Sequence, residues 1–139
     1  MPEEALSSIT EYSVNLKDQE APEPLPVGEY VGVIRAAERR ESQRSTMYAA
    51  VSFFIDSAQF PPDYTDGNPD GTTIIFRRVG LEDNPQARYG TKRFLESIGA
   101  PLGKKIDCHE WVGLEAALEI THETYEGVKR AVINRVRAV

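Results

Sequence analysis

Cysteine is nearly absent from this chain of 139 residues: Cys108 is the only one, so no disulfide can form within the chain. The sequence also lacks an Asn-x-Ser/Thr glycosylation site and any run approaching the ~20 apolar residues that span a bilayer. Its first residues, Met-Pro-Glu-Glu-Ala, do not have the composition of a signal peptide. These absences predict a protein of the reducing cytoplasm that has no membrane partner.

Motifs that carry catalysis or bind metal are also missing. Cys108, His109 and His122 offer ligands at no spacing typical of a zinc site. The segment Asp66–Gly71 matches the first half of a calcium-binding loop, but Arg77 stands where that loop needs a glutamate. We therefore expect a structural turn there, and we expect neither a metal nor a cofactor nor an enzymatic activity.

The net charge of −6 is concentrated at the start of the chain. Residues 1–29 contain seven acids and one base, whereas residues 30–139 contain 15 acids and 15 bases. Three prolines within Glu20–Pro26 disfavour regular structure. We therefore divide the chain into an acidic N-terminal arm, residues 1–24, and a neutral domain, residues 25–139, which is able to carry a basic face.

Alternating apolar residues predict five strands, and turn-forming residues separate them. The strands are expected at Val27–Ala37, Thr46–Asp56, Thr73–Val79, Gly113–Thr121 and Val128–Val136. They are connected by a polar turn at Glu38–Ser45, a long loop at Ser57–Thr72, a helix with a connector after it, and a turn at His122–Gly127. Trp111, in the connector, is expected to anchor the core.

The helix is expected between the third and fourth strands. Asn84 suits the N-cap, Pro85 suits the first helical position, and Gly99 follows Ile98 where a helix C-terminus favours glycine. The resulting order β-β-β-α-β-β is that of the OB-fold, a five-stranded Greek-key barrel. We predict a mainly β protein: an OB-fold-like barrel with an extended N-terminal arm.

An OB barrel binds oligonucleotides across strands two and three, between the loop joining strands one and two and the loop joining strands four and five. The sequence places cations, which neutralise phosphates, and aromatic rings, which stack on bases, in these segments. Only one of the neighbours Arg77 and Arg78 can face outward. The predicted nucleic-acid-binding residues are Arg35, Arg39, Arg40, Arg44, Tyr48, Phe54, Arg77, Arg78, Tyr125, Lys129 and Arg135. The alternative, in which the rings pack under a loop and the arginines are only solvated, stays open.

A set of segments in residues 25–137 also matches a known family in order and spacing. These segments are Leu25–Ile34, Glu38–Ser45, Tyr48–Ile55, Lys92–Ala100, Asp107–Gly113 and Leu114–Val136. In them the chain resembles the small single-stranded-DNA-binding proteins of tailed bacteriophages. The resemblance implies an OB-fold that coats single-stranded DNA in the host cytoplasm during phage replication and recombination, with replication or recombination proteins as partners. The basic C-terminus departs from the acidic tip that many such proteins carry.

A second class of function remains open, in which the barrel serves protein contact as a phage assembly or accessory module. This alternative predicts that Arg39, Arg40, Arg44, Arg77 and Lys129 scatter over different faces. The acids of the arm are expected to compete with DNA for the basic face or to recruit a partner. Exposed strand edges and the arm are compatible with a homodimer.

Overall fold

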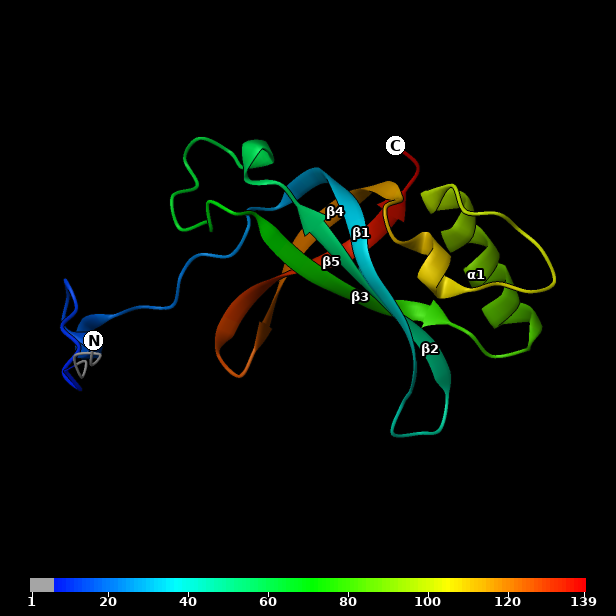
Figure 1. Cartoon of the computed structure of the whole chain (residues 1–139), viewed down its shortest axis with the longest axis horizontal. Coiled ribbons are helices and arrows are strands. Elements are labelled where there is room, and N and C mark those ends of the chain that lie inside the picture. Colours follow the sequence, from blue (N-terminus) through cyan, green and yellow to red (C-terminus); the bar gives the residue numbers. More distant parts are fainter. Residues whose placement is uncertain (1–6) are drawn as a thin grey trace, which may run out of the picture.

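The computed structural model describes residues 7–139, which contain one antiparallel sheet of five strands and one α-helix (Figure 1). The elements are β1 (Gly28–Glu41), β2 (Met47–Ile55), β3 (Thr72–Gly80), α1 (Pro85–Ile98), β4 (Glu115–Tyr125) and β5 (Val128–Arg137). Short 3-10 helices lie at Leu16–Asp18, Ser57–Gln59 and Cys108–Trp111. The sheet order is β3-β2-β1-β4-β5. The predicted mainly β class and the order of elements are confirmed.

Both hairpins extend further than their polar sequences indicate. The prediction that Arg39 and Arg40 lie in a turn is wrong, because they pair with Ala49 and Tyr48 and prolong β1 to Glu41. The predicted turn at His122–Gly127 is likewise too long, since β4 continues to Tyr125. Only Glu126 and Gly127 form the turn, both with positive φ (50° and 79°), as a two-residue hairpin with the twist of its strands requires.

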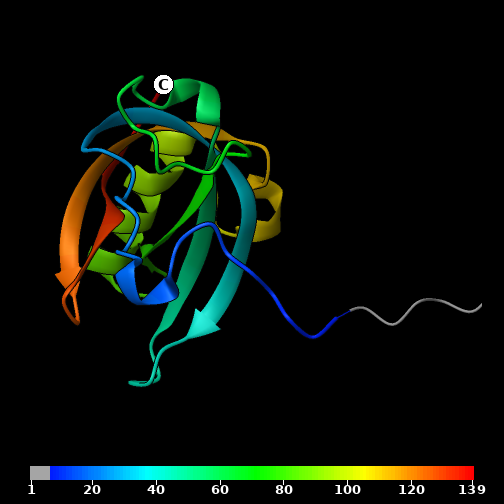
Figure 2. The same cartoon turned by 90° about the vertical axis from the view of Figure 1, so that its left-hand side faces the viewer.

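Helix α1 begins and ends where the capping residues predict. The Asn84 side chain accepts a hydrogen bond of 2.9 Å from the Ala87 amide, and Gly99 ends the helix with φ 72°. The helix lies at the end of the sheet away from the arm (Figures 1 and 2), and its buried residues Phe94, Leu95 and Ile98 belong to the core. Within residues 7–139 no helix has the length and apolar character needed to cross a membrane.

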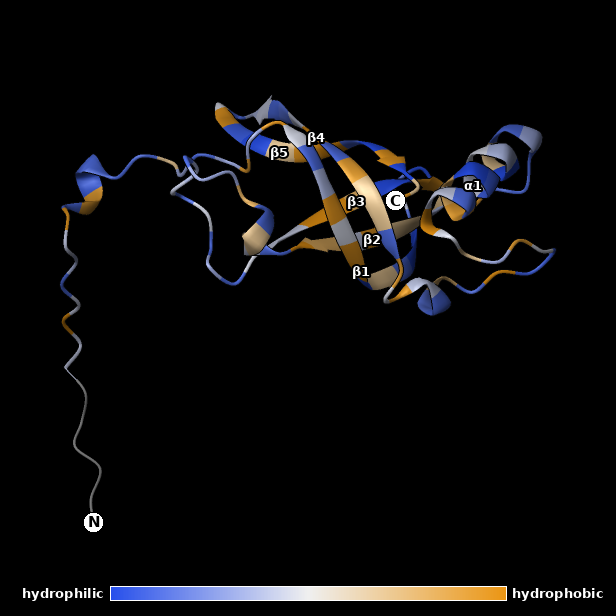
Figure 3. Ribbon diagram, turned by 90° about the horizontal axis from the view of Figure 1, so that it is seen from above, coloured by the Kyte–Doolittle hydropathy of each residue, from blue (hydrophilic) through white to orange (hydrophobic). Residues whose placement is uncertain are grey.

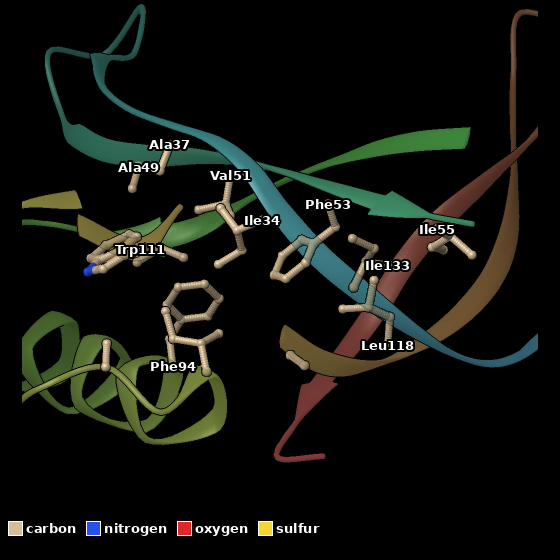
Figure 4. Close-up of a cluster of buried hydrophobic side chains, with 14 of the residues drawn as sticks. Ile34, Ala37, Ala49, Val51, Phe53, Ile55, Phe94, Trp111, Leu118 and Ile133 are labelled. Atoms are coloured by element: carbon tan, nitrogen blue, oxygen red, sulfur yellow. The ribbon is translucent and has the colours of Figure 1, made fainter. Parts of the chain in front are cut away.

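The interior of the curved sheet holds one apolar core. All five strands contribute side chains to it. Trp111 and Phe94 lie between the sheet and the helix (Figure 4). The ribbon coloured by hydropathy shows apolar and polar residues alternating along the strands (Figure 3). The predicted core position of Trp111 is confirmed, since it is 2% exposed. A bulge after Ile34 shifts the phase of β1, so that Ala37, and not Ala36, is buried together with Ile34.

The predicted closed barrel is not found. β3 and β5 form the two edges of the sheet and approach each other without pairing. The Arg78 guanidinium of β3 bridges the two edge strands instead of backbone hydrogen bonds. One of its nitrogens donates to the Ile133 carbonyl and, at 2.9 Å, to the Asn134 carbonyl. These acceptors of β5 therefore bind a side chain rather than amides of β3. We refer to this junction as the β3–β5 seam.

We expect Arg78→Met to lower the free energy of unfolding by about 1–2 kcal/mol, because charged hydrogen bonds to two carbonyls are lost. Arg77→Met is a matched control, since the Arg77 side chain forms no ion pair and no hydrogen bond within residues 7–139. The control should stay within about 0.5 kcal/mol of wild type. Urea denaturation followed by circular dichroism measures both, and equal stabilities of the two variants would show that the seam contributes nothing.

Candidate nucleic-acid interface

The solvent side of β1, β2 and β3 forms a face that we call the outer face. In β2, Tyr48, Ser52 and Phe54 point away from the core set of Ala49, Val51 and Phe53, as the alternation predicts. Their partners in register continue this face onto the neighbouring strands. They are Arg40 opposite Tyr48, Ala36 and Ile75 opposite Ser52, and Thr73 opposite Phe54.

Arg35 and Phe54 form a stacked pair on the outer face. The guanidinium carbon of Arg35 lies 3.5 Å from the centroid of the Phe54 ring. The other end of the ring contacts Gly71, where a β-carbon would meet Phe54 Cζ at 2.5 Å. The β1 bulge permits this contact, because it follows Ile34 and leaves Arg35 without a partner on β2. Phe54 is therefore half-covered, while Arg35 presents an exposed planar cation.

Arg40, Glu38 and Tyr48 form a polar cluster toward the β1–β2 turn. Arg40 Nη2 lies 2.8 Å from Glu38 Oε2, with both side chains exposed. The hydrogen bond with Glu38 raises the pKa of Arg40, and Tyr48 contributes to the same effect. Arg40 consequently carries a positive charge held in place beside an aromatic ring, although Glu38 neutralises part of it.

A bulge in β3 directs the side chains of Arg77 and Arg78 to different places. Both stand opposite the single residue Ala50, because Phe76 pairs with Val51 and Val79 with Ala49. Arg77 is exposed and keeps the phase of Ile75 on the outer face. Arg78 turns to the β3–β5 seam and lies over the Phe76 ring at 5.2 Å. The outer face thus receives one of the two arginines.

The two long hairpins project on the same side of the molecule and flank β3 (Figure 1). Arg44 lies exposed in the turn between β1 and β2. Tyr125 stands at the end of β4 with 59% of its surface exposed. The guanidinium carbon of Arg130 lies 5.1 Å from the centroid of its ring, and the same guanidinium forms an ion pair with Glu123.

Besides Arg78, three of the predicted residues lie away from the outer face. Arg39 shares the phase of Ala49, on the side of the sheet where Cys108 lies, and its charge acts on the Cys108 thiol. Lys129 forms an ion pair of 3.2 Å with Glu23 of the arm. Arg135 pairs with Glu119 in the β4–β5 ladder. The structure therefore brings together Arg35, Arg40, Tyr48, Phe54 and Arg77, with Arg44 and Tyr125 on the flanking turns.

Cys108, His122 and Asp66, which belong to the segments that resemble metal or nucleophile motifs, make structural contacts. Cys108 Sγ lies 3.6 Å from the Ala37 carbonyl, and burial, assisted by Asp107, raises the pKa of its thiol. His122 Nε2 lies 2.7 Å from the carbonyl of Leu25, in a different part of the fold. Asp66 accepts a hydrogen bond of 2.7 Å from the Glu23 amide. Within residues 7–139 no cluster of three His, Cys, Asp or Glu side chains is positioned to hold a metal.

Sequence reasoning missed two residues of the outer face. Ile75 is 42% exposed beside Ser52, and its alternation with Arg77 was the signal that could have identified it. Gly71 adopts φ 94° and contacts Phe54 from the end of the long loop. No sequence pattern marks that contact, since it depends on how the loop returns to the sheet.

The fold and this surface define a mainly β protein that carries arginines and aromatic rings on one face of an open five-stranded sheet. A scan against models of known protein families finds no match, and a search of curated proteins finds none with significant similarity to this chain.

Proposed function

We propose that this chain is a non-enzymatic single-stranded-DNA-binding protein with OB-like architecture. In this proposal it coats single strands in phage replication and recombination, as the resemblance implies. The observation that carries the proposal is the Arg35–Phe54 stack on the outer face of β1 and β2. Cationic grooves with stacking platforms are the means by which proteins bind single strands without sequence preference.

The strand order supports OB-like architecture. The OB-fold is a partly open barrel whose ligand face covers strands two and three. Bringing β3 against β5 would turn the order β3-β2-β1-β4-β5 into a closed ring, and the two edges already approach at the seam. The projecting hairpins then take the positions of the loops that flank an OB ligand face.

The outer face suggests a division of roles among its residues. Phe54 is already covered by Arg35, so a base would stack on the free side of the Arg35 guanidinium, with the ring as support. Tyr48 offers a second aromatic surface, six residues before Phe54 along β2. In this proposal, Arg40, Arg44 and Arg77 neutralise phosphates along the single strand.

Fluorescence anisotropy with labelled oligo-dT at several salt concentrations tests the proposal. Binding should occur at low salt and weaken as salt rises, with a log–log slope of about 0.7 for each phosphate neutralised. Oligo-dT and mixed-sequence oligomers should bind alike, because stacking and phosphate contacts do not read bases. Absence of binding at low salt by the folded protein would refute it.

We expect Arg77→Ala to weaken oligo-dT binding and to lower the salt slope by about 0.7, because one phosphate contact is lost. Lys129→Ala is the matched control: its ammonium is paired with Glu23 and lies off the outer face. The control should leave the slope unchanged. Equal losses in the two variants would mean that net charge, and not the outer face, determines binding.

One observation favours the alternative, a protein-contact module. Of the five cations that this alternative expects to scatter, Arg39 and Lys129 lie away from the outer face. The same titration separates the two functions, because a protein-contact module has no affinity for oligo-dT at low salt.

A further inference from the structure

The arm exposes apolar side chains that the domain does not cover. Tyr12, Val14 and Leu16 are 58%, 53% and 61% exposed, and Ile9 is 82% exposed. Figure 3 shows apolar residues along the described part of the arm, between hydrophilic ones. Leu16 begins the short 3-10 helix Leu16–Asp18, and Tyr12 and Val14 lie just before it, so three exposed apolar side chains stand close together in the sequence. Such a cluster is typical of a segment that binds an apolar groove.

The arm is attached at the end of the molecule opposite to α1 (Figure 1). Glu23 is held from three directions: its amide donates to Asp66 at 2.7 Å, its carbonyl accepts from the Tyr64 hydroxyl at 3.0 Å, and its carboxylate pairs with Lys129 at 3.2 Å. Leu25, next to it, is 3% exposed. Residues before Glu23 are therefore directed away from their own domain by a fixed anchor.

A groove lies at the other end of the molecule, between α1 and the connector that follows it. It encloses about 710 Å³, a volume within the range of ligand sites. Its apolar lining consists of Leu81, Leu95, Leu102 and Ile106. Leu102 and Ile106 remain 52% and 39% exposed, so the groove presents apolar surface to solvent. We call it the α1 groove.

The charges of the arm and the α1 groove are complementary. Both acids of the lining already have partners: Glu82 accepts a hydrogen bond of 2.7 Å from the Met47 amide, and Asp83 lies 3.3 Å from Arg88. Lys92 and Lys104 have no ion pair within residues 7–139. On the arm, Glu11, Asp18 and Glu20 likewise form no ion pair within residues 7–139. The groove thus offers free cations to a segment with free acids.

We propose that the arm of one copy of this chain docks into the α1 groove of a second copy. Tyr12, Val14 and Leu16 contact the apolar lining, and the acids beside them pair with Lys92 and Lys104. Arm and groove lie at opposite ends of the molecule, so the contact is heterologous and joins copies head to tail. This inference does not depend on DNA binding.

Sedimentation velocity of the full chain over a range of concentrations, at low salt and without DNA, tests the contact. Wild type should increase in average mass with concentration. An arm variant, Tyr12→Ser with Val14→Ser, and a groove variant, Leu102→Asp, should each stay monomeric. Tyr89→Ser is the control on α1: Tyr89 is 60% exposed but does not line the groove, and this variant should associate like wild type. All substituted residues are exposed, so the fold should persist, and thermal melts check this.

A mixture of the two variants is the decisive sample. The arm variant keeps an intact groove and the groove variant keeps an intact arm, so together they should form one complex of twice the monomer mass and nothing larger. A wild type that stays monomeric at all concentrations, as it would with each arm in its own groove, overturns the proposal. So does a mixture without the complex, or an arm variant that associates like wild type, which would mean that the groove takes another ligand.

Discussion

Truncation of Phe53 to alanine is expected to lower the free energy of unfolding by about 3–5 kcal/mol. The ring is 0% exposed at the centre of the core. Gly32 packs directly beneath it, since a β-carbon there would lie 3.2 Å from Phe53 Cβ and 2.4 Å from Leu118 Cδ1. The surrounding β-strands cannot move inward to fill the space, so most of the cavity should remain. Urea denaturation followed by circular dichroism measures the loss.

Phe54→Ala is the natural control, because Phe54 is next in the sequence, has the same side chain and lies on the other side of the sheet. Its half-covered ring should contribute less to stability than Phe53. If the two variants lost equal stability, the assignment of these residues to the inner and outer faces of β2 would be wrong.

Loss of the Arg35–Phe54 stack is expected to cost about 1–3 kcal/mol of affinity for oligo-dT. Arg35→Ala and Phe54→Ala should each produce most of this loss, because the guanidinium lies 3.5 Å from the ring centroid and each group positions the other. The double variant should then lose less than the sum of the single losses. A double-mutant cycle by anisotropy, with coupling of about 0.5 kcal/mol or more, measures this dependence.

Arg93 and Tyr89 on α1 provide a matched control for this cycle. They form a similar cation–ring pair, with 5.9 Å between the guanidinium carbon and the ring centroid, but lie far from the outer face. Arg93→Ala and Tyr89→Ala should leave oligo-dT affinity close to wild type. Additive losses for Arg35 and Phe54, or an equal effect of the control pair, would contradict the assignment of the stack to DNA binding.

Much of the fold could be predicted because its signals are local. Helix α1 has its cap at Asn84, proline at its first position and glycine after its last, and each acts through neighbouring backbone groups. The two faces of β2 follow from the pleat alone, which separates Phe53 from Phe54. The polar ends of the hairpins were missed because solvated polar residues are compatible with a turn as well as with a strand. Cross-strand pairing, such as that of Arg40 with Tyr48, makes these residues part of the strands.

The order of the elements, the bounds of α1 and the two faces of β2 could be predicted from the residues alone, since all of these depend on spacing along the chain. Which arginines share a surface depends instead on how the strands pair. The bulges in β1 and β3 free Arg35 to cover Phe54 and send Arg77 and Arg78 to different places. A bulge exists only relative to a partner strand, and the same is true of the open β3–β5 seam and of the distance between the arm and the α1 groove.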